Sequence, residues 1–368
     1  MKTTIKAELV AHSTNQQGDE LISILATFPR IILSEINTHR MLSKNTSSSR
    51  AIPFSKMVES VQNDPFIPIA WQKEHTGMQG YEYLVDRKHE NAVYEWLKAR
   101  DFAVKQANIM NSDGVTKQLT NRLLEPFMWT TMLITGSREG WQNFFNLRCP
   151  QYSITITSPE DIKGKVISFK SKKEFIKFGN NLELTENWTE LDWLLANKGQ
   201  AEIHMMALAE KIYDAIQESK PKVLTEGEWH IPFEDKIEQK LTGILSVGDE
   251  TTIMNPFLRV KIATALSART SYTVVGDEKE IDYEKMIALH DRLIAQNPPH
   301  SSPFEHCARA MSEEEYESFR KGKHEVTLMD NTENQYWFIE DDSGEKGWCN
   351  NLKGFIPYRY LVDNKINI

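Results

Sequence analysis

Two runs of alternating side chains near the start of the chain constrain its fold most strongly. Residues 3–11 and 20–28 alternate between apolar and polar side chains, the period of two with which a β-strand buries one face. The polar segment 15–19 between them contains Gly18 and predicts a turn. Helix-forming sequence with apolar residues near helical spacing follows over 81–110. We therefore expect the α+β class, with an antiparallel or mixed sheet and long helices.

The same criteria divide the rest of the chain. Short apolar runs predict strands at 127–135, 152–157, 166–169, 258–267, 326–329 and 336–339. Helical periodicity predicts helices at 31–36, 116–124, 141–148, 200–217, 283–295 and 313–319. Residues 219–258 are rich in proline and charge and are interpreted as a connection.

Charge and cysteine content argue against several classes of protein. The net charge of −9 over 368 residues is unlike that of a general nucleic-acid binder, which usually carries a basic balance. Cys149, Cys307 and Cys349 are widely separated, which supports neither a disulfide framework nor a thiolate zinc site. Residues 1–13 lack the apolar core of a signal peptide, and no run approaches the ~20 apolar residues that span a bilayer. A cytoplasmic protein with no membrane or nucleic-acid partner is expected.

The stretch from Glu35 to Arg50 is the most unusual polar segment. It combines two arginines, a histidine, an asparagine and a run of hydroxyl side chains, with almost no apolar residue. Arginine offers a planar fork of donors that fits phosphate, and small hydroxylated residues let backbone N–H groups approach an anion. This composition suits an anion-binding segment, and a solvated serine-rich loop is the alternative.

A second polar stretch, His300 to His306, has the sequence His-Ser-Ser-Pro-Phe-Glu-His. Two histidines and a glutamate suggest a metal site, but their spacing is not that of the HExxH zinc motif and no further ligand cluster lies near in sequence. No metal site is therefore predicted. No Gly-x-Gly-x-x-Gly motif precedes a helix, so a Rossmann cofactor site is not indicated either.

Five isolated polar residues have an ordinary structural interpretation. Arg122 borders an apolar stripe, where an arginine usually extends its head into solvent. Asn143 and Arg148 are the polar exceptions in an otherwise aromatic helix, and a buried asparagine there would need a partner. Gln79 lies in a segment rich in proline and glycine, interpreted as extended chain that turns back. Arg359 is interpreted as a solvated residue of an edge strand.

The stretch from Glu35 to Arg50 resembles the signature of the flavin-dependent thymidylate synthases (the ThyX type), Arg-His-Arg-x-x-Ser-x-Asn-Glu-x-Ser-x-Arg. The residues on its fixed positions are His39, Arg40, Ser43, Asn45, Ser48 and Arg50. Thr38 and Thr46 replace the first arginine and the glutamate, and Glu35 stands where the family usually has glutamine.

Other segments resemble the same family. Residues 300–306 are similar to its His-x-[Ser/Thr]-Pro-Phe-Glu-His motif. Further family patterns are matched by Arg122 with Pro126, by Asn143 with Arg148, and by Gln79 with Gly80. In the family the histidine motif precedes the arginine signature, so the resemblance implies a circular permutation, as in longer members from bacteriophages. It implies a catalytic domain of residues 1–149 and 199–310, an insertion at 150–198 and a C-terminal extension at 311–368.

The resemblance also implies a reaction. It implies reductive methylation of dUMP to dTMP with FAD, with NADPH and methylenetetrahydrofolate as co-substrates, by a homotetramer whose sites form between subunits in the cytoplasm, the host cytoplasm for a viral protein. The residues implied to hold FAD are His39, Arg40, Ser43, Asn45, Asn143, His300, Ser302 and Glu305. Those implied to hold the nucleotide are Ser48, Ser49, Arg50, Gln79, Arg122 and Arg148. Arg148 is the expected catalytic residue, because a cation along the base edge stabilises negative charge that develops on the pyrimidine.

Two other functions stay open at this point. The departures at Glu35, Thr38 and Thr46 fall on the pyrimidine side of the family's site, which favours a flavin-dependent pyrimidine-nucleotide hydroxymethylase or a dCMP-modifying enzyme. A non-catalytic nucleotide-binding protein that keeps the fold is the second alternative. Ser48 has no neighbouring base that would make it a nucleophile, so it is assigned to positioning.

Overall fold

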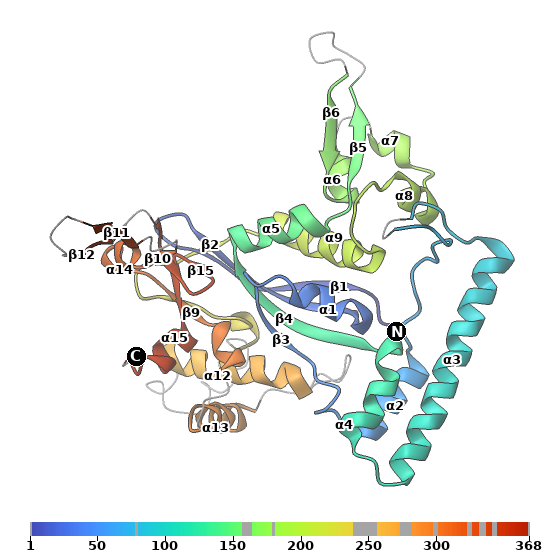
Figure 1. Cartoon of the computed structure of the whole chain (residues 1–368), viewed down its shortest axis with the longest axis horizontal. Helices are drawn as coiled ribbons and strands as arrows, with labels where there is room; N and C mark the ends of the chain where they lie inside the picture. The colour runs from blue at the N-terminus through green and yellow to red at the C-terminus, as the bar shows by residue number, and fades with distance from the viewer. Residues whose placement is uncertain are drawn as a thin grey trace, which may run out of the picture.

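A five-stranded sheet lies at the centre of the molecule (Figure 1). The computed structural model describes residues 2–77, 80–156, 164–178, 181–237, 256–272, 282–296, 301–321, 326–330, 336–340 and 344–366. The strand order is β3-β4-β2-β1-β7. The strands are β1 (Lys6–Thr14), β2 (Glu20–Pro29), β3 (Ser43–Thr46), β4 (Trp129–Ser137) and β7 (Lys222–Val223). β1 and β2 form the predicted antiparallel hairpin, and only β7 pairs in parallel, so the mixed sheet of an α+β fold is confirmed.

Two helices cover one face of this sheet. α5 (Arg138–Arg148) and α9 (Ile203–Gln217) lie side by side on it, both near their predicted bounds (Figure 1). Ile22, Ile24 and Ile134 of the sheet are buried against Trp141 and Phe144 of α5. The apolar spacing of residues 141–148 also predicts that Leu147 is buried, which is wrong: its side chain is 56% exposed because it lies on the solvent side of α5.

The opposite face of the sheet is covered by the C-terminal part of the chain. A small sheet packs there, made of β8 (Trp229–His230), β9 (Ala308–Ala310) and β16 (Phe355–Pro357). Leu21 of the central sheet is buried with Ala308, Leu352 and Phe355. The last 20 residues or so of the chain therefore share a core with the first strands.

Residues 258–267 are a helix, and the predicted strand is wrong. They belong to α12 (Pro256–Arg269), which packs against α13 (Tyr283–Ile294). Val260, Ile262, Ala263 and Ala265 are all completely buried. A helix buried on most sides has no polar face, so its sequence lacks the helical period and can alternate by chance like a strand.

A helical layer lies beside the end of the sheet (Figure 1). It contains α2 (Phe54–Asn63), α3 (Asp86–Ser112), α4 (Lys117–Thr120) and the 3-10 helix η2 (Asn121–Phe127). Thr116, where the sequence predicts that a helix begins, caps α4. The spacing of Leu119, Leu123 and Leu124 predicts one apolar side, which is only partly correct, since Leu124 is buried while Leu119 and Leu123 are exposed.

Residues 152–196, which lie in the predicted insertion, form a small unit with its own aromatic core. Its elements are β5 (Tyr152–Thr155), β6 (Val166–Phe169), α6 (Lys172–Lys177), α7 (Asn181–Thr185) and α8 (Glu190–Ala196). Tyr152, Phe169, Phe175 and Trp193 pack together in it. The β5–β6 hairpin projects from the body (Figure 1).

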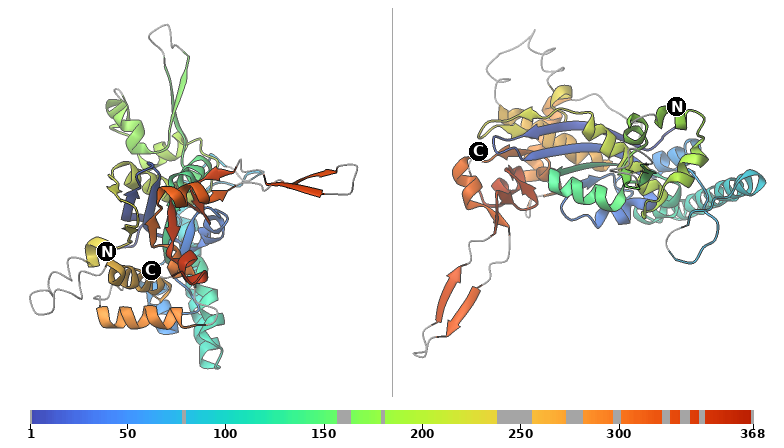
Figure 2. Two further views of the ribbon diagram at one scale, coloured as in Figure 1. Left: turned by 90° about the vertical axis from the view of Figure 1, so that its left-hand side faces the viewer. Right: turned by 90° about the horizontal axis from the view of Figure 1, so that it is seen from above.

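The remaining C-terminal elements surround the small sheet. They are η5 (Ser302–Glu305), α14 (Glu313–Ser318), β10 (Arg320–Lys321), β11 (Val326–Asp330), β12 (Tyr336–Glu340), β13 (Glu345–Lys346), β14 (Trp348–Cys349), β15 (Leu352–Lys353) and α15 (Tyr358–Asp363). The predicted strands at 326–329 and 336–339 pair as a hairpin that extends away from the body (Figure 2). Arg359 lies in α15, so its assignment to an edge strand is wrong. Among the described helices, none is both long and apolar enough to cross a membrane.

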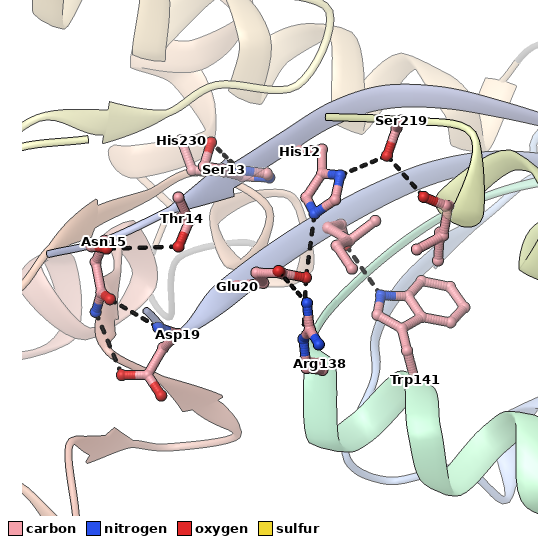
Figure 3. A network of polar contacts seen from close by, with 12 residues as sticks. His12, Ser13, Thr14, Asn15, Asp19, Glu20, Arg138, Trp141, Ser219 and His230 are labelled. Carbon is pink, nitrogen blue, oxygen red and sulfur yellow. Dashed lines mark hydrogen bonds and ion pairs between the residues drawn. The ribbon is translucent and has the colours of Figure 1, made fainter. Parts of the chain in front are cut away.

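A polar network ties the first hairpin to both covering helices (Figure 3). The His12 ring lies between Ser219 Oγ, at 2.5 Å, and Glu20 Oε2, at 3.3 Å. Arg138 Nε, at the start of α5, donates to Glu20 Oε2 over 3.1 Å. Ser219 follows α9, so one histidine, with a side chain 5% exposed, fixes the hairpin between two helix ends.

Candidate functional site

The arginine-rich stretch runs from a short helix into the edge strand of the sheet. Its first residues end α1 (Leu33–Asn37), which follows the 3-10 helix η1 (Arg30–Ile32) in the region predicted to be helical. Residues 43–46 then form β3, paired antiparallel to β4 with Ser43 opposite Thr135. The side chains of Ser43 and Asn45 are buried, two residues apart on one face of the strand. This segment is therefore anchored by a strand and is not a solvated loop.

Asn45 is the junction between this stretch and the late histidine motif. Its Oδ1 accepts hydrogen bonds from Ser302 Oγ and Ser271 Oγ, both at 3.2 Å. Its Nδ2 donates to the carbonyl oxygen of Ser267 in α12. Ser48 N also donates to the Ser271 carbonyl over 2.9 Å. Two motifs that are 257 residues apart in sequence thus meet around one buried amide.

Two residues near the C-terminus contact Ser43 and Glu305, which lie in the two motifs that Asn45 joins. Asn351 Nδ2 donates to Ser43 Oγ over 3.0 Å. Arg359 Nη1 forms an ion pair with Glu305 Oε1. Neither Asn351 nor Arg359 was predicted as a site residue, because the sequence offers no local signal that links the last strands to β3 or to η5.

Lys44 is a second site residue that the sequence did not single out. Its Nζ donates to the carbonyl oxygen of His39. Burial lowers the pKa of Lys44 to about 8, and the negative charge of Glu305 opposes this shift. Lys44 is therefore a partly desolvated cation close to a carboxylate, and it could have been found by its position between Ser43 and Asn45.

His39 and Arg148 form a hydrogen-bonded pair. Arg148 Nε donates to His39 Nε2 over 2.9 Å, and Arg148 Nη1 pairs with Glu35 Oε2 at 3.2 Å. Since Nε2 accepts this hydrogen bond, the proton of a neutral His39 is on Nδ1. Burial and then the charges of Arg148 and Lys44 lower the pKa of His39 to about 4, so the ring is neutral at pH 7. The ring also lies edge-on to Phe144, with centroids 4.9 Å apart.

Other predicted site residues lie at the surface. Arg40, Arg50, Arg122 and Asn143 are exposed, so the possible burial of Asn143 is not observed. Ser49, which is also a predicted site residue, is buried.

The backbone around Ser49 brings two of these arginines near each other in the fold. Ser49 Oγ donates to Glu125 Oε1 over 2.6 Å, and Asn121 Nδ2 donates to the Ser49 carbonyl oxygen over 2.6 Å. Arg50 and Arg122 are the residues that follow Ser49 and Asn121, so they flank one backbone contact. Among the described contacts, none links them to Arg148, and the predicted Gln79 and His300 lie outside the described residues.

A buried chain of hydrogen bonds runs across the neighbouring strands of the sheet, on the same face, to the late motif. Ser13 Oγ contacts His230 Nδ1 at 2.9 Å, and His230 Nε2 contacts Ser23 Oγ at 2.8 Å. Ser23 Oγ contacts Thr135 Oγ1 at 2.6 Å, and Thr135 Oγ1 contacts His306 Nδ1 at 2.9 Å. Burial lowers the pKa of His306 to about 3. The histidine next to Glu305 is thus a neutral structural residue.

The described residues provide no evident metal site and no reactive thiolate. They contain no group of three histidine, cysteine or acidic side chains that could hold a metal ion. Burial raises the pKa of the Cys307 and Cys349 thiols to about 12, so neither is a thiolate at neutral pH. Two surface hollows of about 460 and 510 Å³ are lined by other residues, the first around α14 and the second between α2 and α3.

Comparisons with known proteins give weak structural likenesses. No protein family model and no curated protein sequence matches the chain. The UMP/dUMP methylase PolB from Streptomyces cacaoi bound with 5-Br UMP is 16% identical over 40% of this chain and 78% of that chain, with a TM-score of 0.33. Bound with 5-Br dUMP, it is 12% identical over 53% of this chain and 94% of that one, again with a TM-score of 0.33. The flavin-dependent thymidylate synthase ThyX from Helicobacter pylori complexed with FAD and dUMP is 17% identical over 53% and 67% of the two chains, with a TM-score of 0.27.

Proposed function

We propose that the chain is a flavin-dependent enzyme that methylates C5 of a uracil nucleotide, converting dUMP to dTMP with FAD, NADPH and methylenetetrahydrofolate. The observation that carries the proposal is the hydrogen bond between Asn45 and Ser302, because it joins the two stretches that resemble one family's motifs. A circular permutation changes the order of segments and keeps their contacts. The meeting of the two motifs in reversed order therefore supports a permuted member of that family.

The chemistry of the residues around Asn45 fits a flavin dinucleotide. Such a cofactor presents phosphates, which need donors, and sugar-like hydroxyls, which need acceptors. The Ser43 hydroxyl and the Lys44 ammonium are donors, and the Glu305 carboxylate is an acceptor. Neutral His39 adds a ring on the same segment. A bound flavin would supply the hydride transfer that no side chain can perform.

We assign the nucleotide to the arginines. Arg50 and Arg122 are exposed and flank one backbone contact, which suits a phosphate with two negative charges. Arg148 is held by its neighbours at His39 and Glu35, so its guanidinium is oriented before any ligand binds. Along the edge of a pyrimidine it would stabilise the negative charge that develops on the base.

We further propose that the sites form between subunits of a homotetramer. The Arg148 group and the Arg50–Arg122 group share no described contact within one chain, and α3 carries exposed apolar residues such as Phe102, at 64%, and Ile109, at 45%. Mixing inactive Arg148→Ala and Arg50→Ala subunits should restore activity. Some sites of a mixed tetramer would take Arg50 from the first variant and Arg148 from the second, and would therefore contain both arginines. Mixed preparations that stay inactive while native mass spectrometry of one isotope-labelled variant with the other shows mixed tetramers would exclude shared sites.

The reaction itself is tested with labelled nucleotides. The purified protein should be yellow or become so with FAD, and it should release tritium from C5-labelled dUMP with a product mass increased by one methyl group. A colourless protein that takes up no FAD would refute the proposal and favour the non-catalytic nucleotide-binding alternative.

Glu35 favours one second candidate, a dCMP-modifying enzyme. Its carboxylate lies 3.2 Å from Arg148 Nη1, so an acceptor stands beside the donor assigned to the base. The amino group of cytosine requires such an acceptor. Parallel assays with C5-labelled dCMP decide between the two substrates, and a hydroxymethyl group in the product would be recognised by its mass.

A further inference from the structure

The C-terminal segment, residues 345–366, contacts two of the residues assigned to the flavin. Asn351 donates to Ser43 Oγ over 3.0 Å and to the Met41 carbonyl oxygen over 3.4 Å. Arg359 forms an ion pair with Glu305. Both contacts link positions more than 50 residues apart, and one links opposite ends of the chain, with a separation of 308 residues.

This segment is firmly attached to the body. β16 pairs antiparallel with β9, with Phe355 opposite Ala310. Tyr358 is buried, and its hydroxyl contacts His290 Nε2 at 3.0 Å. Gly354 has a φ of +74° and lies against Asn15, where a Cβ would be 2.2 Å from Asn15 Nδ2. Side chains on such a segment are held in place well enough to orient others.

Arg359 acts on Glu305 and not on an anion of its own. Its Nη1 pairs with Glu305 Oε1, and its Nε pairs with Asp363 Oδ2 at 3.2 Å. Two carboxylates neutralise the guanidinium, which makes it a poor phosphate ligand although it is 37% exposed. The contact fixes one of the two Glu305 oxygens. Within the described residues Oε2 accepts no other hydrogen bond, so it is left as an oriented acceptor.

Asn351 has the opposite effect on Ser43, which it leaves as a hydrogen-bond donor. Its amide donates to Ser43 Oγ, which occupies a lone pair of the hydroxyl oxygen. The Ser43 hydrogen must then point to another acceptor. Ser43 is thereby preset as a donor, and Glu305 as an acceptor.

We infer that Asn351 and Arg359 are positioning residues that preset Ser43 and Glu305 for a phosphorylated polyhydroxyl chain, the phosphate accepting from Ser43 and a hydroxyl donating to Glu305. The ribityl phosphate part of a flavin has this chemistry. The inference rests on the proposed function and adds two residues of the C-terminal segment to the site.

The test is FAD affinity, measured by quenching of flavin fluorescence on binding to the full-length protein. Arg359→Ala should raise the Kd for FAD about tenfold, the order expected when an acceptor loses a charge-assisted contact that orients it. Arg359→Lys should recover part of the loss. Lys346→Ala changes another charge of the same segment, one that pairs with Glu317, and should leave the Kd within about twofold.

A double-mutant cycle separates positioning from a general loss of structure. If Arg359 acts through Glu305, Arg359→Ala should add less than about twofold to the Kd once Glu305→Gln is present. A second, independent cycle uses Asn351 and Ser43. Asn351→Ala should raise the Kd for FAD in the wild-type background and leave it unchanged in a Ser43→Ala background. Thermal unfolding of the flavin-free variants shows whether each one is folded.

Three results would overturn the inference. An unchanged FAD Kd for both Arg359→Ala and Asn351→Ala would show that the segment does not act on the site. An equal effect of Arg359→Ala in the wild-type and Glu305→Gln backgrounds would show that it acts by another route. If the wild-type protein binds no FAD, the proposed function and this inference both fail, whereas the first two results leave the function intact.

Discussion

At the scale of the residue, the pair of His39 and Arg148 shows how one side chain defines the state of another. The guanidinium donates to His39 Nε2, and its charge adds to burial in keeping the ring neutral. In turn the neutral ring and Glu35 hold the guanidinium in one orientation. Arg148 is thus ready to meet an electron-rich edge of a ligand.

Arg148→Ala should abolish tritium release from C5-labelled dUMP, because the charge that stabilises the base in the transition state is removed. Its melting temperature should change little, since Arg148 is at the last position of α5 and partly exposed. Arg138→Ala, at the first position of the same helix, is the control. Turnover that persists in Arg148→Ala would show that its assigned role is wrong.

The buried histidines predict a loss of stability in acid. The pKa of His306 is lowered by burial from 6.5 to about 3, and that of His230 to about 3 by burial and by the nearby His12 and His306. Between these values the unfolded chain binds more protons than the folded one. The contribution of these two histidines to the free energy of unfolding should therefore be constant above pH 6.5 and fall as the pH decreases toward 3, by up to about 1.4 kcal/mol per pH unit for each histidine.

Urea unfolding at a series of pH values measures this slope. His306→Gln removes one titrating group, so its curve should fall less steeply than that of the wild type between pH 6.5 and 3, while it is less stable at pH 7 because the contact with Thr135 is changed. Equal slopes for the two proteins would show that His306 is not held neutral.

At the scale of the element, β3 is short but makes the connection on which the site depends. Four residues pair with β4, and the alternation of the strand directs Ser43 and Asn45 to one face. On that face lie η5, α12 and the C-terminal segment. A single edge strand therefore joins β4 to these three other parts of the chain.

Asn45→Ala should lower the free energy of unfolding by about 2–3 kcal/mol, because the Ser267 carbonyl and two serine hydroxyls lose a buried partner. Thr46→Ala, on the next position of the strand, is the matched control and should cost less than about 1 kcal/mol. Urea unfolding at pH 7.5 compares them, and equal losses would show that Asn45 is not the junction described.

At the scale of the whole molecule, the predicted insertion and the C-terminal segment differ in how they are attached. The ends of the insertion lie together, with Lys198 N donating to the Gln151 carbonyl over 2.8 Å, and its aromatic core is separate. The C-terminal segment instead shares the cores that contain β2, α12 and α13. The insertion is a removable unit, and the C-terminal segment is part of the body.

Replacing residues 152–196 by a short glycine linker should leave a folded protein with a cooperative melt, since the aromatic cluster of this unit is its own and Leu191 and Leu194 are its partly buried side chains on the main core. Removing residues 345–366 should prevent folding, because buried side chains such as Phe355 and Tyr358 are lost from two cores. Circular dichroism and thermal melting compare the two truncations. A folded protein without residues 345–366 would contradict this division.

Features that depend on neighbouring residues could be predicted from the sequence. Alternation over 3–11 and 20–28 gave the β1–β2 hairpin, and helical spacing gave α3, α9 and α13, because those periods follow from which face is buried. The cluster of arginine, histidine and hydroxyl side chains in Glu35–Arg50 is likewise a local property of the sequence. The α12 helix escaped because burial on most sides removes the polar face on which the period depends.

The site itself was decided by tertiary structure. Its hydrogen bonds join Asn45 to Ser302, Ser43 to Asn351 and Glu305 to Arg359. Arg359 was dismissed as a solvated arginine because its own neighbours in sequence include no site residue. The sequence alone determined which chemical groups the chain possesses and which local elements carry them. Only the folded chain determined which groups meet, because contacts across the sheet depend on how whole layers pack and not on the spacing of residues.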